Sequence, residues 1–138
     1  MNNYHEKKKN NDEPKHYVIK KFGCAFRGIA EAIAIDNSFK YHFAAAILAI
    51  IFGLVLKIDE AEWIAIIIVI AMVLVAEMFN TVCEVMMKMY TSEYHELVKK
   101  LLDISAGAVL FASIAALITG IIIFGNNISK LFRCFPNI

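Results

Sequence analysis

Three long runs of apolar residues constrain the fold of this chain more than any other feature of its sequence. The run 43–56 carries no charge, the run 63–83 carries a single charge, and the run 104–129 carries none. A helix needs about 20 consecutive apolar residues to cross a bilayer, whereas a soluble helix needs a polar stripe that faces water. The second and third runs are long enough as they stand, and the first is long enough if its helix begins near Phe39. The runs therefore predict three transmembrane helices and disfavour the alternative, a soluble helical bundle.

Composition agrees with a membrane protein of one domain. Hydrophobic residues make up 59% of the 138 residues, against roughly 45–50% in ordinary soluble domains. We therefore expect an all-α integral membrane domain over 16–125, a disordered polar tail over 1–15 and a short C-terminal tail over 126–138. The three spans are expected at about 39–57, 62–87 and 103–125.

The segment 17–35, ahead of the first span, has the pattern of an amphipathic helix. Apolar residues recur in it at helical spacing, at Val18, Phe22, Ala25, Phe26, Ile29 and Ile33. Lys20, Lys21 and Arg27 lie mostly off this stripe. Such a helix lies in the membrane interface with its cations toward anionic headgroups. Packing of the same helix against the transmembrane bundle is a compatible alternative.

Positive charges are distributed unevenly along the chain. Those that precede or open the first span are Lys7, Lys8, Lys9, Lys15, Lys20, Lys21, Arg27 and Lys40. The first loop, 57–62, has one lysine against three acidic residues, and the second loop region holds Lys88, Lys99 and Lys100. Because lysine and arginine accumulate on the cytoplasmic side of a membrane, we expect a cytoplasmic N-terminus and second loop.

Glu77 is the one charged residue between Trp63 and Cys83. At about 100° per residue, Glu77, Asn80, Thr81 and Glu84 share one helical stripe. A carboxylate in a transmembrane segment costs ~2.5 kcal/mol or more at the centre of the bilayer, so an acid there is a candidate functional residue. We therefore predict that this stripe forms a site.

The expected topology brings Asp36, Glu84 and the second loop to one membrane boundary, with Glu77 two helical turns deeper, about 10 Å along the helix. Boundary carboxylates suit Mg²⁺, which prefers a few carboxylates together with substrate phosphates. A desolvated glutamate suits a general base acting on a hydroxyl that arrives from the lipid phase. Two simpler roles stay open: Glu84 and Lys88 are spaced for an ordinary ion pair, and Asp36 is placed to cap the first span.

Three motifs at consistent spacing resemble the prokaryotic diacylglycerol kinase and undecaprenol kinase family. They are Glu77-x-x-Asn80-x-x-x-Glu84, then Ser92-Glu93-Tyr94-His95-Glu96-Leu97, then the stretch that begins Asp103-Ile104-Ser105-Ala106-Gly107. The resemblance implies a trimeric kinase in the bacterial plasma membrane, with three transmembrane helices, an amphipathic surface helix and active sites shared between subunits. It implies transfer of the γ-phosphoryl group of ATP, with Mg²⁺, to a lipid alcohol. The chain has no P-loop or protein-kinase motif, and we expect no nucleic-acid partner.

The resemblance also assigns roles to individual residues. It makes Glu77 the catalytic base, Asn80 its partner, and Asp36 and Glu84 the ligands of Mg²⁺. The residues assigned to ATP are Tyr17, Asp36, Glu84, Glu93, His95 and Asp103. Lys88 and Lys99 are two further candidate ATP contacts, which the resemblance does not assign. The residues assigned to the lipid substrate are Phe39, Glu77 and Ala106.

The chain departs from the family pattern at several of these positions. Asp36 stands where the family usually has glutamate, and Ser38 where many Gram-positive members have asparagine. Lys88 replaces an aspartate, and Leu102 replaces a lysine that is expected to contact phosphate. Our hypothesis is that Lys99 or Lys88 supplies the missing cation.

These observations favour a lipid kinase that phosphorylates undecaprenol, because His42 is typical of the Gram-positive branch. Diacylglycerol is the alternative substrate. A catalytically weakened membrane regulator would account for the changes at Lys88 and Leu102. An ion carrier that uses Glu77 and Glu84 as a proton path would account for the buried acids and leave the motifs of 92–103 unexplained.

Overall fold

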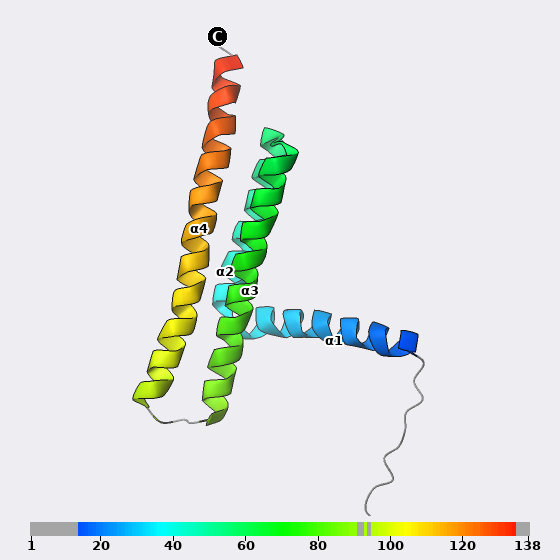
Figure 1. Ribbon diagram of the computed structural model, residues 1–138, viewed down its shortest axis with the longest axis vertical. Coiled ribbons are helices and arrows are strands. Elements are labelled where there is room, and N and C mark those ends of the chain that lie inside the picture. Colours follow the sequence, from blue (N-terminus) through cyan, green and yellow to red (C-terminus); the bar gives the residue numbers. More distant parts are fainter. Residues whose placement is uncertain (1–13, 91–92, 94, 135–138) are drawn as a thin grey trace, which may run out of the picture. The chain divides into compact units, whose positions relative to one another are not determined.

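The computed structural model is built from helices (Figure 1), and the residues it describes are 14–90, 93 and 95–134. The helices are α1 (Pro14–Ile35), α2 (Asn37–Leu56), α3 (Glu60–Tyr90) and α4 (Glu96–Cys134). α2, α3 and α4 are each long and apolar enough to cross a membrane. No strand occurs within the described ranges. The all-helical fold and the three candidate spans are therefore as predicted.

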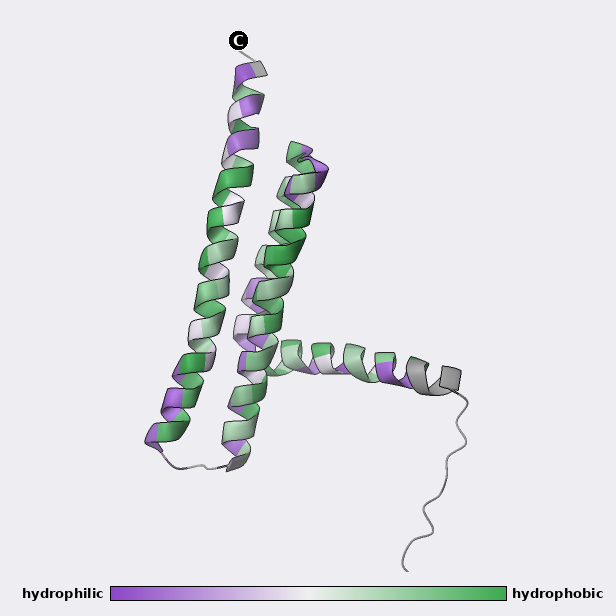
Figure 2. Cartoon of the chain, viewed as in Figure 1, coloured by the Kyte–Doolittle hydropathy of each residue, from purple (hydrophilic) through white to green (hydrophobic). Residues whose placement is uncertain are grey.

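The chain divides into two compact units, 1–31 and 32–138. The described part of the first unit belongs to α1, on which Ile19, Phe22 and Phe26 are exposed. The second unit holds α2, α3 and α4, and α3 packs most extensively against α4. Figure 2 shows that the middle of α4 is mostly hydrophobic and that its hydrophilic residues gather toward its two ends.

The observed helices are longer than the predicted spans. α4 begins at Glu96, seven residues before the expected start at 103, and reaches Cys134, beyond the expected end at 125. The ring Nδ1 of His95 accepts a hydrogen bond from the Leu97 N–H at 3.2 Å, and Glu96 forms an i,i+4 ion pair with Lys100 at 2.8 Å. The helix therefore starts in a polar segment, where capping and ion pairing replace hydrophobic burial.

Side-chain hydrogen bonds fix the antiparallel arrangement of α2, α3 and α4. Thr81, late in α3, donates to Asp36, which caps the start of α2, at 3.0 Å. Asn127, late in α4, donates to both carboxylate oxygens of Glu62, early in α3, at 2.9 and 3.0 Å. We call the end of the bundle where Thr81 bonds Asp36 the Asp36 end, and the end where Asn127 bonds Glu62 the Glu62 end.

The turn between α2 and α3 is compact. Lys57 ends α2 in the left-handed conformation, with φ 52°, and the Ile58 N–H bonds the Gly53 carbonyl at 3.2 Å, as in a Schellman motif. Asp59 and Glu62 form a reciprocal capping box that starts α3, with side-chain-to-backbone bonds of 2.9 and 3.1 Å. The turn folds back so tightly that Trp63 lies against Gly53.

Gly53→Ala is expected to destabilise the protein, because the new Cβ would lie 2.8 Å from Trp63 Cη2 and 3.1 Å from Ile58 Cδ1. Overpacking of this kind costs ~1–3 kcal/mol, so the thermal unfolding midpoint in detergent should fall. Gly125→Ala is the matched control, since nothing lies within 4 Å of its Cβ position. Equal midpoints for the two variants would contradict the close approach of Trp63.

Candidate active site

A polar cluster interrupts the apolar face of α3 near the Asp36 end. The three buried polar or charged residues in the described part of the chain are Glu77, Asn80 and Thr81. They are spaced i, i+3 and i+4, so one face of α3 carries all of them toward the neighbouring helices. The stripe predicted from the sequence is therefore a real internal feature of the bundle, joined at its outer edge by Glu84.

Glu77 is the deepest member of the cluster. Its side chain is 1% exposed, and its Oε1 atom has no hydrogen-bond partner among the described residues. The ionisable groups within electrostatic reach are His42 and Asp36 on the α2 side and Glu84 on α3. A buried carboxylate oxygen without a partner is unusual, because such atoms are normally satisfied. This acceptor is enclosed in the structure, so a ligand that donates to it must displace the side chains around Glu77.

Asp36 has two roles in the structure. Its Oδ1 accepts a hydrogen bond from the Ser38 N–H at 2.8 Å, which caps α2, and its Oδ2 accepts from Thr81 Oγ at 3.0 Å. Thr81 Oγ also lies 3.0 Å from the Glu77 carbonyl oxygen. The capping role that the sequence left open is thus confirmed, and the same carboxylate ties α2 to the helix that carries Glu77. The sequence pattern places Thr81 on the stripe and predicts no contact with Asp36.

Asn80 is held in a fixed orientation by neighbours on two helices. Its Oδ1 accepts from Ser105 Oγ of α4 at 2.8 Å, and its Nδ2 donates to Glu84 Oε1 at 3.1 Å. An amide clamped at both ends cannot flip without losing both bonds. Sequence reasoning placed Ser105 in a family motif but gave it no role, since it resembles any other small residue on a helix face rich in alanine and glycine.

Glu84 marks the outer edge of the cluster. Its Oε2 lies 3.7 Å from Lys88 Nζ, so the predicted i,i+4 ion pair is present, with side-chain exposures of 40% for Glu84 and 71% for Lys88. No group of three or more candidate metal ligands occurs within the described ranges. Mg²⁺ is commonly bound by one or two carboxylates plus substrate phosphates, and the oxygens of Asp36 and Glu84 fit that donor set. These two side chains are the residues that could hold the ion.

The other predicted site residues differ in their surroundings. His95, Lys99 and Asp103 are exposed, and no hydrogen bond or ion pair connects them to it within the described part of the chain. Glu93 is exposed as well. Of the expected lipid contacts, Phe39 is buried and Ala106 is exposed. Tyr17 lies in α1, but its side chain is outside the described residues.

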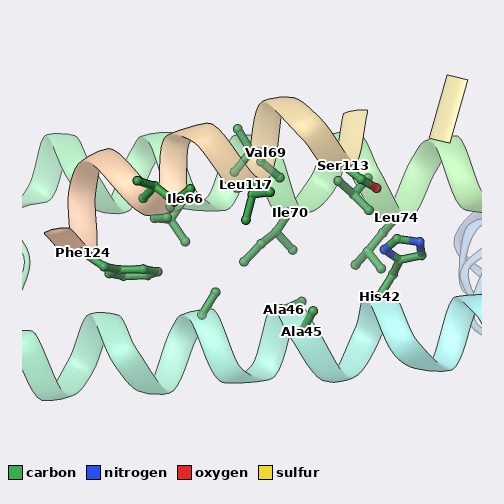
Figure 3. Close-up of a pocket in the computed structure, with 15 residues that line it drawn as sticks. His42, Ala45, Ala46, Ile66, Val69, Ile70, Leu74, Ser113, Leu117 and Phe124 are labelled. Atoms are coloured by element: carbon green, nitrogen blue, oxygen red, sulfur yellow. The ribbon is translucent and has the colours of Figure 1, made fainter. Parts of the chain in front are cut away.

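An apolar groove of about 510 Å³ lies between α2, α3 and α4 (Figure 3). Part of its lining consists of small residues, which leave space between the helices; among them are Ala45 and Ala46 of α2 and Gly120 of α4. Figure 3 shows His42 and Ser113 at one end and Phe124 at the other. The polar end is the one near the cluster, because Val73 and Leu74, which also line the groove, precede Glu77 by about one helical turn.

The fold and the cluster together define a small helical membrane protein with a carboxylate-based site at one end of its spans. Residues 23–124 match the family described as prokaryotic diacylglycerol kinase. The chain belongs to this family of membrane lipid kinases, as the motif resemblance predicted, and the family implies ATP as the phosphate donor.

Individual relatives agree with this assignment. The chain is 33% identical over 106 residues to the undecaprenol kinase of Bacillus subtilis (strain 168), covering 77% of this chain and 86% of the relative. It is 30% identical over 110 residues to the diacylglycerol kinase of Escherichia coli (strain K12), covering 80% and 90%. A diacylglycerol kinase of Synechocystis is 30% identical over 104 residues, covering 75% of this chain and 59% of the relative.

Ser105→Ala is expected to lower kcat about two- to tenfold, because one hydrogen bond that orients Asn80 is worth about 0.5–1.5 kcal/mol. Folding should survive, since only a hydroxyl is removed. Ser129→Ala is the control: Ser129 also lies on α4, and its hydrogen bond in the described structure goes to the Gly125 carbonyl of its own helix. Steady-state kinetics of both variants test the assignment, and an unchanged kcat in Ser105→Ala would rule out a positioning role.

Proposed function

We propose that this protein transfers the γ-phosphoryl group of ATP to the primary hydroxyl of undecaprenol, with Glu77 as the catalytic base. The observation that carries the proposal is the open Oε1 atom of Glu77, buried within a polar cluster that reaches the surface at Glu84. A general base must stand within hydrogen-bond reach of the proton that it removes. A lipid hydroxyl that reaches the cluster from the hydrocarbon side meets Glu77 first.

In this mechanism the lipid hydroxyl oxygen attacks the γ-phosphorus while its proton passes to the Glu77 carboxylate. The new oxygen–phosphorus bond forms as the bond between the γ-phosphorus and its bridging oxygen breaks, and ADP leaves. Most of the acceleration comes from positioning and electrostatic stabilisation, as is usual in phosphoryl transfer. Asp36 and Glu84 would hold Mg²⁺, which supplies neutralisation of the phosphate charge.

The depth of the residues supports this division of labour. Glu77 and Glu84 are seven residues apart on α3, about 10 Å along the helix axis. Glu77 is buried, whereas Glu84 is 40% exposed. In the proposed complex, the nucleotide enters from the water boundary at Glu84 and its γ-phosphate reaches inward to the acceptor hydroxyl beside Glu77. Asn80, which lies between the two acids, keeps its amide group directed at Glu84.

Undecaprenol is the substrate that the groove favours. The groove offers an apolar path that ends at His42 and Ser113, near Glu77, and the buried Ser113 Oγ has no hydrogen-bond partner among the residues that the structure describes. A lone polyprenyl chain with one terminal hydroxyl suits a groove with one polar end. The relative from Bacillus subtilis is named for this substrate, and the relatives named for diacylglycerol make that lipid the second candidate.

We further propose a homotrimer in the bacterial plasma membrane, with a cytoplasmic N-terminus and with α1 in the membrane interface. Exposed Phe22 and Phe26 on α1, interspersed with lysine and arginine, support an interfacial helix. Ala106 and Gly107 are exposed on α4, and a Cβ built at Gly107 would meet no other described side chain or helix within 4 Å. Small residues on an open helix face support close packing against another subunit.

Glu77→Gln is expected to reduce kcat by about 10²- to 10⁴-fold, the contribution typical of a general base. Because glutamine has nearly the same shape, the unfolding midpoint and the oligomeric state should be retained. Glu60→Gln, in the exposed first turn of α3, is the control. A Glu77→Gln variant with the wild-type rate would show that another group removes the proton.

Substrate choice is tested by transfer of labelled phosphate from Mg-ATP, with undecaprenol and diacylglycerol offered in parallel to purified protein in detergent. The expected result is a higher kcat/KM for undecaprenol. A preference for diacylglycerol would overturn the substrate assignment alone. No transfer to either lipid by folded protein would favour the regulatory alternative.

A further inference from the structure

A second, smaller cleft lies on the outer side of the polar cluster. Its volume is about 230 Å³, and it is lined by Glu84, Met87 and Lys88 of α3 and by Val98 and Leu102 of α4. It thus shares Glu84 with the cluster that contains Asn80 and Ser105. The cleft has an apolar wall formed by three side chains, and it carries one acid and one cation.

The ion pair in this cleft is loose. Lys88 Nζ lies 3.7 Å from Glu84 Oε2, and the lysine side chain is 71% exposed. A charge-assisted hydrogen bond is normally 2.7–2.9 Å, as in the Glu96–Lys100 pair at 2.8 Å. An exposed pair at the longer distance contributes little to stability. The ammonium group of Lys88 can therefore exchange Glu84 for another anion.

The pair of opposite charges restricts what the cleft can bind. A simple anion is attracted by Lys88 and repelled by Glu84, whereas a simple cation is attracted by Glu84 and repelled by Lys88. A polyphosphate that carries a divalent cation satisfies both side chains, since the cation takes the carboxylate and the phosphate oxygens take the ammonium. This charge pattern matches the nucleotide of the proposed reaction.

We propose that Lys88 is the residue that binds the polyphosphate chain of ATP in this cleft. The inference rests on the proposed function, and it selects one of the two cations that the sequence left open. Lys99 does not line the cleft, and Lys100 is engaged with Glu96. Lys88 is the cation among the residues that form the cleft wall.

The position of Leu102 makes the proposal testable by rescue. Leu102 lines the same cleft from α4, so a lysine at position 102 can place its ammonium group in the same space from the opposite wall. If the proposal is correct, nucleotide binding requires a positive charge in the cleft, whether α3 or α4 supplies it.

The experiment compares wild type, Lys88→Met, Lys88→Met/Leu102→Lys and Lys100→Met. Affinity for a non-hydrolysable ATP analogue is measured by calorimetry in detergent, with Mg²⁺ and with EDTA, and KM for ATP and for the lipid is measured by phosphate transfer. Lys88→Met should weaken analogue binding about tenfold both with Mg²⁺ and with EDTA, and it should raise KM for ATP about tenfold. The lipid KM should be unchanged, the double variant should recover most of the loss, and Lys100→Met should match wild type.

Two results would overturn the proposal. If Lys88→Met weakens binding only when Mg²⁺ is present, Lys88 acts through Glu84 and does not contact phosphate. If a folded double variant shows no recovery, the phosphate chain does not occupy this cleft. A third result separates this proposal from the proposed function. If Lys88→Met weakens analogue binding but the wild-type protein phosphorylates neither lipid, the proposed lipid kinase reaction is refuted and the nucleotide site remains.

Discussion

Polar groups inside a membrane bundle need partners, because hydrocarbon offers none. In this chain Asp36, Thr81, Asn80, Ser105 and Glu84 meet that need by bonding to one another across three helices. Apolar packing between transmembrane helices lacks the drive that water supplies in a soluble core. The arrangement of α2, α3 and α4 at the Asp36 end therefore depends on these hydrogen bonds, and the residues that form the site also determine how the helices pack.

Glu77 differs from its neighbours because the network leaves one of its oxygens without a partner. Its side chain is as buried as any in the bundle. The unpaired oxygen therefore costs folding free energy, while the other members of the cluster have hydrogen-bond partners. Such an exception is expected at a functional site, where a ligand completes the set of hydrogen bonds. The fold thus pairs Asp36, Thr81, Asn80, Ser105 and Glu84 with one another and leaves this carboxylate oxygen for the proposed chemistry.

The helical fold, the three spans and the polar stripe of α3 followed from the sequence, since charge-free runs and a lone internal acid have few structural solutions. The family assignment followed from motif spacing, and the comparisons confirmed it. The start of α4 did not follow, because the cap by His95 and the Glu96–Lys100 pair extend the helix through residues that look like a loop. Ser105 and the approach of Trp63 to Gly53 depend on which faces of distant helices meet. Periodicity within one segment does not carry that information.

α4 connects two hydrogen-bonded points that lie far apart. Ser105 bonds Asn80 near one end of the helix, and Asn127 bonds Glu62 near the other, about 33 Å further along the axis. A helix is stiff along its length, so α4 behaves as a rod pinned to α3 at two places. The two bonds therefore set the register of α4 against α3 at both ends, so a helical slip that broke one of them would also displace the other.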